Sequence, residues 1–129
     1  MKKRLPALYA NEDKGLKANA LIHFFSPGSN WDWYASEGSY VDANGFYDTD
    51  HEKVDFLFFG LVSGFEVELG YFSLSELEKL RFPLLIKEGS TQKTLGVFQY
   101  QIERDLHWIP QSLEALLEKH TQQRNNQAA

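Results

Sequence analysis

The amino-acid sequence predicts one α+β domain, in which a mainly antiparallel sheet of about five strands packs against two or three helices. Short runs rich in β-branched and aromatic residues recur between turn-prone residues, as expected for strands. Two other segments have the spacing and the end signals of helices. With 129 residues, 43% of them apolar and none a cysteine, such a domain can bury a core without disulfides. We place the domain in residues 1–120 and expect a polar, disordered tail over residues 121–129.

The first two strands are predicted on either side of a loop. Residues 20–25 are rich in β-formers, and residues 26–30 combine serine, proline, glycine and asparagine, which favour a turn. Residues 31–37 begin in strict alternation of apolar and polar side chains. This alternation places Trp31 and Trp33 on one face of the second strand, opposite the aspartate between them.

The middle of the chain is predicted to hold a hairpin and a buried strand. The pair Asn44-Gly45 readily adopts the left-handed dihedrals of a two-residue turn, so we expect a hairpin tip there. Residues 56–62 are apolar without alternation, which indicates an inner strand covered on both faces. Residues 65–71 alternate cleanly. The expected inward side chains are Phe65, Val67 and Leu69, and the expected outward ones are Glu66 and Glu68.

The last part of the chain is predicted to contain two helices and a further hairpin. Ser73 and Glu76 have the spacing of a capping box, which predicts a short helix to about Leu80. Residues 84–102 can form a hairpin around a glycine-serine pair. Residues 112–120 are predicted to form the final helix, with a leucine stripe facing the core. No apolar run approaches the roughly 20 residues that span a bilayer, so we expect a cytoplasmic protein without a membrane partner.

Three blocks of the sequence are similar to one family of proteins. Residues 24–34, 58–77 and 102–108, in this order, resemble the DUF2958 family, and residues 68–74 (ELGYFSL) are the most specific part of the match. The resemblance covers most of the chain. It implies an accessory protein of a plasmid, an integrative element or a phage, and it carries over no catalytic residue. The chain departs from the compact pattern of the family by apparent insertions at residues 39–54 and 87–101.

The charge is distributed very unevenly along the chain. Eleven carboxylates lie between Asp32 and Glu78 against one cation, Lys53, which leaves about ten net negative charges in the middle of a chain whose total is −5. The ends are mildly basic. Such an asymmetry is a statement about partners and not about fold. Because nucleic-acid affinity comes chiefly from cations, we expect no direct DNA binding.

The leading hypothesis is therefore a non-enzymatic binding protein that presents a carboxylate-rich face to a basic, nucleic-acid-binding protein of the host or of the mobile element. Carboxylates on a rigid sheet can take the place of phosphates, as in a DNA mimic that inhibits restriction or CRISPR defence. The oligomeric state stays open. The expected partner-binding residues are Asp42, Asp48, Asp50, Glu52, Asp55, Glu66, Glu68, Trp31 and Trp33.

Two alternatives stay open beside this hypothesis. One is a metal-binding protein or metal-dependent enzyme that uses His51 with the carboxylates around it, although no histidine has the spacing of a helical metal motif. The other is an accessory nucleic-acid-processing module with an aromatic surface around Trp31. We expect no cofactor, no metal and no catalytic residue. Glu103, Arg104 and Asp105 are interpreted as a local ion pair.

Overall fold

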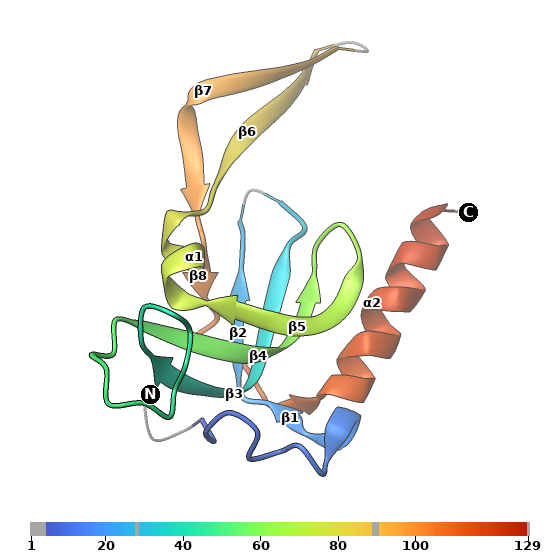
Figure 1. Cartoon of the computed structure of the whole chain (residues 1–129). Helices are drawn as coiled ribbons and strands as arrows, with labels where there is room; N and C mark the ends of the chain where they lie inside the picture. The colour runs from blue at the N-terminus through green and yellow to red at the C-terminus, as the bar shows by residue number, and fades with distance from the viewer. Residues whose placement is uncertain (1–4, 28, 89–90, 129) are drawn as a thin grey trace.

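In this computed structural model, residues 5–27, 29–88 and 91–128 are described, with the backbone alone for 81–88, 91–100, 127 and 128. A curved antiparallel sheet forms the body, α2 (Leu113–Ala128) packs beside it, and a long hairpin projects away from it (Figure 1). A short helix, α1 (Leu74–Lys79), lies where that hairpin begins. The predicted α+β class is confirmed.

Five strands form the main sheet in the order β5-β4-β3-β2-β8, and all neighbours are antiparallel. Their bounds are β2 (Ile22–Phe25), β3 (Asp32–Val41), β4 (Asp55–Ser63), β5 (Val67–Ser73) and β8 (Glu103–Arg104). The strand predicted at residues 56–62 is β4, and it pairs on both sides, as expected of an inner strand.

Two further strand pairs lie outside the main sheet. The first joins β1 (Asn19–Ala20) to β9 (Gln111–Ser112), and the second joins β6 (Arg81–Glu88) to β7 (Thr91–Gln101). The second pair is the hairpin predicted within residues 84–102, and it is the projecting element of Figure 1. Its expected tip at Gly89-Ser90 lies outside the described residues.

Each face of the sheet has its own hydrophobic core. On the face that carries α1, Trp33, Phe58 and Phe72 pack against Leu77 of the helix. On the opposite face, Tyr34 and Leu61 pack against the side of α2. We call these the α1 face and the α2 face. The leucine stripe predicted on the last helix is confirmed, since its first two leucines are completely buried on the α2 face.

A β-bulge at Ser36 reverses the alternation of β3. Ala35 lies opposite Gly60 of β4, whereas Glu37 lies opposite Phe59, so the register shifts by one residue between them. Because side chains alternate along a strand, the extra residue turns Glu37 from the face of Ala35 to the face of Phe59. A carboxylate thereby enters the α2 face, and Glu37 is only 5% exposed there.

The capping box is present as the sequence predicts. The side chain of Ser73 accepts a hydrogen bond from the backbone N–H of Glu76, and the Glu76 carboxylate accepts one from the backbone N–H of Ser73. The helix that they begin ends at Lys79, close to the expected end. Reciprocal satisfaction of two free N–H groups makes so short a helix stable.

Three expectations about elements are wrong. The turn at Gly45 is present, with a positive φ of 88°, but residues 42–54 form an irregular loop between β3 and β4 and not a hairpin. Phe65 is 88% exposed and Leu69 is 42% exposed, because the chain turns at residues 64–66 and β5 is an edge strand. The expected tail is helical, because α2 continues to Ala128 and its later turns contact the β4–β5 turn.

Candidate functional site

Asp42 does not face a partner. It is 3% exposed at the end of β3, where its carboxylate accepts hydrogen bonds from the backbone N–H groups of Asn44 (2.9 Å) and Phe46 (3.0 Å) and from the hydroxyl of Thr49 (2.8 Å). The bond from Phe46, followed by that from Thr49, holds the pKa of Asp42 below its usual value. Asp42 therefore organises the loop of residues 42–54, and its expected role in partner binding is wrong.

Asp55 is also committed to the fold. Its carboxylate accepts from the N–H of Phe56 (2.8 Å) and from both the N–H (3.1 Å) and the hydroxyl (2.5 Å) of Ser75 in the first turn of α1. Partial burial pulls the pKa of Asp55 upward, but the hydrogen bonds outweigh it and leave the pKa below its usual value. Asp55 thus ties β4 to α1, and it presents no free carboxylate to a partner.

Trp33 on β3 and Trp31, which directly precedes β3, differ in exposure. Trp33 is 3% exposed in the core of the α1 face, so its expected role in partner binding is wrong. Trp31 is half-buried and packs against Trp33 (ring centroids 5.7 Å apart) and edge-on against the exposed ring of Phe65 (5.0 Å). The two rings lie on the same side of the sheet, as predicted, and that side is mainly interior.

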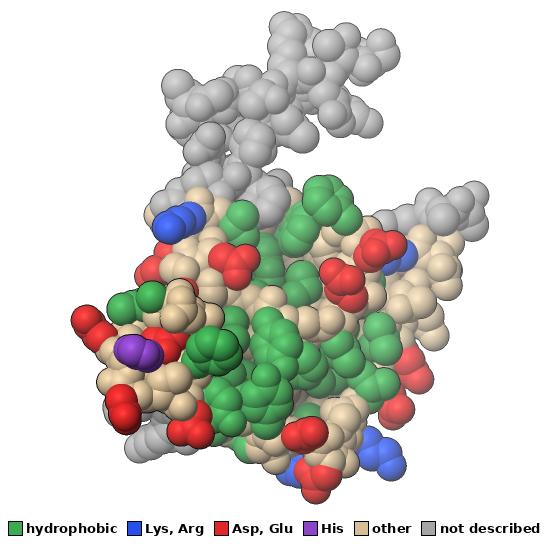
Figure 2. Space-filling view, in the orientation of Figure 1, with side chains coloured by type: hydrophobic (Ala, Val, Ile, Leu, Met, Phe, Trp, Pro, Cys, Tyr) green, Lys and Arg blue, Asp and Glu red, His purple; other side chains and the backbone are tan. Residues whose placement is uncertain are grey.

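The remaining predicted carboxylates are exposed, and those in the loop of residues 42–54 lie beside an apolar patch. Figure 2 shows apolar side chains gathered over β4 and β5, with carboxylates around them and Lys and Arg near the margins of this view. We define the tyrosine patch as Tyr9, Tyr47, Leu69 and Tyr71, which are 42–49% exposed. We define the carboxylate rim as the exposed residues Glu12, Asp48, Asp50 and Glu52, which lie on the segments that carry Tyr9 and Tyr47. Glu66 and Glu68 are exposed too, but Glu66 lies in the β4–β5 turn and Glu68 lies opposite Val62 on the α1 face of β5.

The patch is an ordered cluster drawn from three segments. The ring of Tyr9 lies 5.8 Å from that of Tyr47 in the loop of residues 42–54 and 6.5 Å from that of Tyr71 on β5. The hydroxyl of Tyr71 donates to the hydroxyl of Tyr9 (3.1 Å). Phe59 of β4 supports the ring of Tyr71 from below at 5.0 Å. Segments far apart in the sequence therefore converge on one surface.

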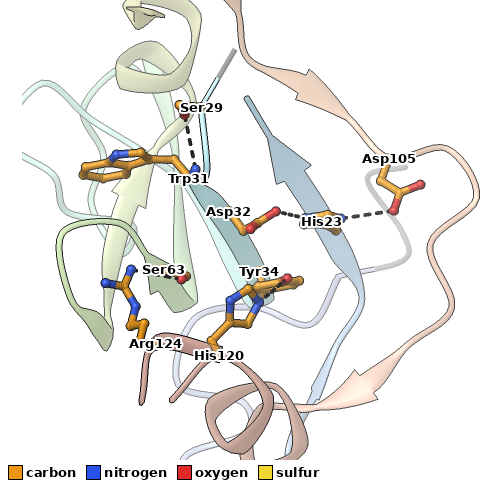
Figure 3. Close-up of polar contacts among 9 residues, drawn as sticks. All are labelled: His23, Ser29, Trp31, Asp32, Tyr34, Ser63, Asp105, His120 and Arg124. Carbon is orange, nitrogen blue, oxygen red and sulfur yellow. Dashed lines mark hydrogen bonds and ion pairs between the residues drawn. The ribbon is translucent and has the colours of Figure 1, made fainter. Parts of the chain in front are cut away.

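A second cluster, which sequence reasoning missed, is centred on His23 of β2. Figure 3 shows its imidazole between the carboxylates of Asp32 and Asp105, with Nε2 2.7 Å from the first and Nδ1 3.1 Å from the second. The ring stacks on Tyr34 at 4.5 Å, with planes only 9° apart. Asp105 therefore pairs with a histidine on another strand, and the expected local ion pair with Arg104 is wrong.

Two carboxylates at one imidazole favour its charged form. Burial acts to lower the pKa of His23, but the hydrogen bonds to Asp32 and Asp105 and the charges of both raise it overall. The bond from His23 in turn lowers the pKa of Asp105. With both ring nitrogens donating, His23 has no lone pair with which to accept a proton from a substrate. These three side chains join β2, β3 and the segment after β8, and we call them the His23 clamp.

A neutral pair continues the cluster on the α2 face. The hydroxyl of Tyr34 lies 2.7 Å from Nε2 of His120 on α2 (Figure 3). Burial lowers the pKa of His120, whereas burial and the charges of Asp32 and Asp105 raise the pKa of Tyr34. The phenol therefore keeps its proton and the imidazole stays neutral, and the two are joined by a hydrogen bond. This hydrogen bond joins α2 to the middle of the sheet.

A cleft of about 850 Å³ opens beside these residues, between the β2–β3 loop and the later turns of α2. Arg124 of α2 lies at one side of the cleft and donates to the carbonyl groups of Phe65 (2.9 Å) and Gly64 and to the hydroxyl of Ser63 (3.3 Å). Among the described residues, the buried hydroxyl of Ser26 at the cleft has no hydrogen-bond partner. The lining of the cleft is mainly polar, and the side chain of Arg124 forms part of it.

The loop around His51 binds the side chain of a lysine. Lys53 Nζ donates to the carbonyl oxygens of Thr49 (2.8 Å) and His51 (3.4 Å), so the loop already holds a cation of its own. Across the part of the chain that the structure describes, no three His, Asp or Glu side chains gather as a metal site requires. Neither described helix has the length and apolar character needed to cross a membrane.

Comparison of the chain with family models, with curated proteins and with solved structures finds no match. The resemblance to the DUF2958 family therefore stays a prediction.

Proposed function

We propose that this protein is a non-enzymatic binding protein of a mobile genetic element. In this proposal, its tyrosine patch and carboxylate rim dock onto a basic protein that binds nucleic acid. One observation carries the proposal: three exposed tyrosines, in contact with one another, lie among exposed carboxylates. Scattered exposed apolar residues need no explanation, whereas a contiguous patch with a polar rim is typical of an interaction site.

The two parts of the surface have different roles in the proposed complex. Aromatic side chains at the centre of an interface supply most of the binding energy, and tyrosine is among the residues enriched there. The carboxylates around the centre raise the association rate and select basic partners, most strongly at low ionic strength. This division replaces the uniform carboxylate face expected from the sequence, since Asp42 and Asp55 are used inside the fold.

The partner is described by its chemistry. It carries a basic surface with an apolar centre, and DNA itself is excluded as the direct ligand because the rim repels phosphates. A restriction or CRISPR effector, whose nucleic-acid channel is positively charged, fits this description. We place the interaction in the cytoplasm, where such an effector meets DNA.

The proposal is tested by affinity capture from nuclease-treated host lysate at about 50 mM and about 500 mM salt, which differ strongly in screening length. We expect basic, nucleic-acid-binding proteins to be retained at the lower salt and identified by mass spectrometry. The rim variant, with Asp48→Asn, Asp50→Asn and Glu52→Gln, should lose them. The purified candidate should then bind the parent protein directly in a titration.

A matched control carries the same change of charge elsewhere. Glu103→Gln, Glu114→Gln and Glu118→Gln neutralise three exposed carboxylates on β8 and α2, outside the rim. This control should retain the partner as the parent does. Capture of no basic protein at low salt, or equal loss in both triple variants, would show that the carboxylates act only as a general charge.

A further inference from the structure

A pocket of about 330 Å³ lies beneath the tyrosine patch, and its chemistry identifies which group of the partner enters it. Its lining includes the rings of Tyr9, Phe59 and Tyr71 and the side chain of Leu69. Glu12 and Glu37 bring two carboxylates to it. Ligand pockets span about 300 to 1,000 Å³, so this one is at the small end of the range and has room for one long side chain.

Glu37 is a built feature of this pocket. The bulge at Ser36 turns it onto the face of Phe59, and its two oxygens accept the backbone N–H groups of Tyr9 (2.8 Å) and Asn11 (3.0 Å). The amide of Asn11 also donates to the carbonyl of Ser36 (3.3 Å). The same carboxylate thus fixes the segment that carries Tyr9 and places a negative charge at the pocket.

The carboxylates at the pocket also act on the hydroxyl of Tyr71. The hydrogen bond to Tyr9 and partial burial raise the pKa of Tyr71 to about 12, and the negative charges of Glu37 and Glu12 act in the same direction. No lysine, arginine or histidine is among the described residues that line the pocket. Among its described lining residues, the pocket therefore combines aromatic rings, an apolar wall and two carboxylates without a cationic side chain, which together favour a cation.

We propose that this pocket receives an arginine side chain of the basic partner, an inference that rests on the proposed function. The aliphatic stem of arginine can pack along Phe59 and Leu69 while its head remains near the carboxylates. Its planar guanidinium stacks on tyrosine rings and is weakly hydrated, so it enters such a pocket at a lower cost than the ammonium of lysine. The pocket is thus the point where the apolar and the electrostatic parts of the surface meet.

The test uses a titration of the isotope-labelled protein, followed by NMR, with N-acetyl-arginine amide and with N-acetyl-citrulline amide, its neutral analogue of nearly the same shape. We expect the arginine compound to shift the backbone amides of residues 9–12 and 69–71 in a saturable way and the citrulline compound to cause no saturable shift. Glu12→Gln removes one exposed carboxylate at the pocket and should weaken arginine binding about two- to fivefold.

The matched control is Asp13→Asn, which makes the same change at the neighbouring exposed carboxylate that does not line the pocket. It should bind arginine as the parent does. Equal affinity for the arginine and citrulline compounds, or equal weakening by Glu12→Gln and Asp13→Asn, would overturn the inference while leaving the captured partner in place. Selective arginine binding by a protein that captures no basic partner would instead overturn the proposed function.

Discussion

The imidazole of His23 has a carboxylate at each ring nitrogen, and only its protonated form can donate to both. The three side chains come from β2, β3 and the segment after β8, so the cluster joins parts of the chain that are 82 residues apart. A neutral imidazole would leave one carboxylate facing a lone pair. The clamp is therefore sensitive to pH in both directions.

We expect the contribution of this clamp to the free energy of unfolding to be largest at mildly acidic pH. The pKa of His23 is raised above 6.5, so its contribution is complete below pH 6.5 and is lost as the pH rises through the folded-state value. The pKa of Asp105 is lowered below 3.8, so its contribution is present above pH 3.8 and is lost as the pH falls through the folded-state value.

The measurement is the melting temperature of the parent and of Asp105→Asn across this range. The difference between the two should be greatest between pH 3.8 and pH 6.5 and should shrink on either side. Asp13→Asn, at an exposed site, should show no such profile. A difference that grows as the pH rises above 6.5 would contradict the assignment of a charged His23.

Two neighbouring phenylalanines on β4 differ in how deeply their side chains are buried. Phe58 is 1% exposed in the core of the α1 face, whereas Phe59 is half-buried under Tyr71 on the α2 face. Phe58→Ala should lower the free energy of unfolding by about 3 to 5 kcal/mol, because it leaves a cavity. Phe59→Ala should cost about 1 to 2 kcal/mol, since less apolar area is removed from the interior. Urea unfolding of both variants measures the two values, and equal costs would refute this placement.

At the scale of elements, α2 is held to the sheet by three kinds of contact along its length. Its leucines pack on β4, His120 is hydrogen-bonded to Tyr34, and Arg124 binds the β4–β5 turn through three oxygen atoms. These contacts lie on successive turns of one helix face, since three or four residues separate their positions. The helix therefore continues past residue 120 because its later turns have tertiary partners.

Arg124→Ala should loosen the β4–β5 turn without unfolding the domain. Charged hydrogen bonds are worth about 1.5 to 3 kcal/mol when buried, and partial exposure reduces this to about 1 to 2 kcal/mol. The rate of backbone amide hydrogen exchange should increase at residues 63–66 and remain unchanged in β2. Gln122→Ala, on the exposed side of α2, serves as the control. Unchanged exchange at the turn would show that the guanidinium contacts carry no stability.

For the molecule as a whole, local patterns predicted the elements better than the sites. The capping box at Ser73 and the apolar run of β4 are encoded by neighbouring residues, so their assignments are confirmed. The His23 cluster joins residues from three distant segments, and no spacing in the sequence signals it. The bulge at Ser36 leaves no mark in the alternation, although it determines which face Glu37 occupies. The charge count likewise could not separate structural carboxylates from exposed ones.

Chemically identical substitutions should therefore have opposite effects in different parts of this protein. The rim variant changes the net charge from −5 to −2 at three exposed sites, relieves like-charge repulsion, and should leave the melting temperature unchanged or slightly higher. Asp42→Asn and Asp55→Asn remove acceptors that hold a loop and a helix, so each should lower the melting temperature although each removes only one charge. Thermal unfolding at low and high salt separates the two causes, because salt screens the repulsion between exposed charges and leaves the short hydrogen bonds largely intact. Destabilisation of the rim variant to the same extent as Asp42→Asn would show that the loop carboxylates hold the fold, and the rim would then lose its place as a binding surface.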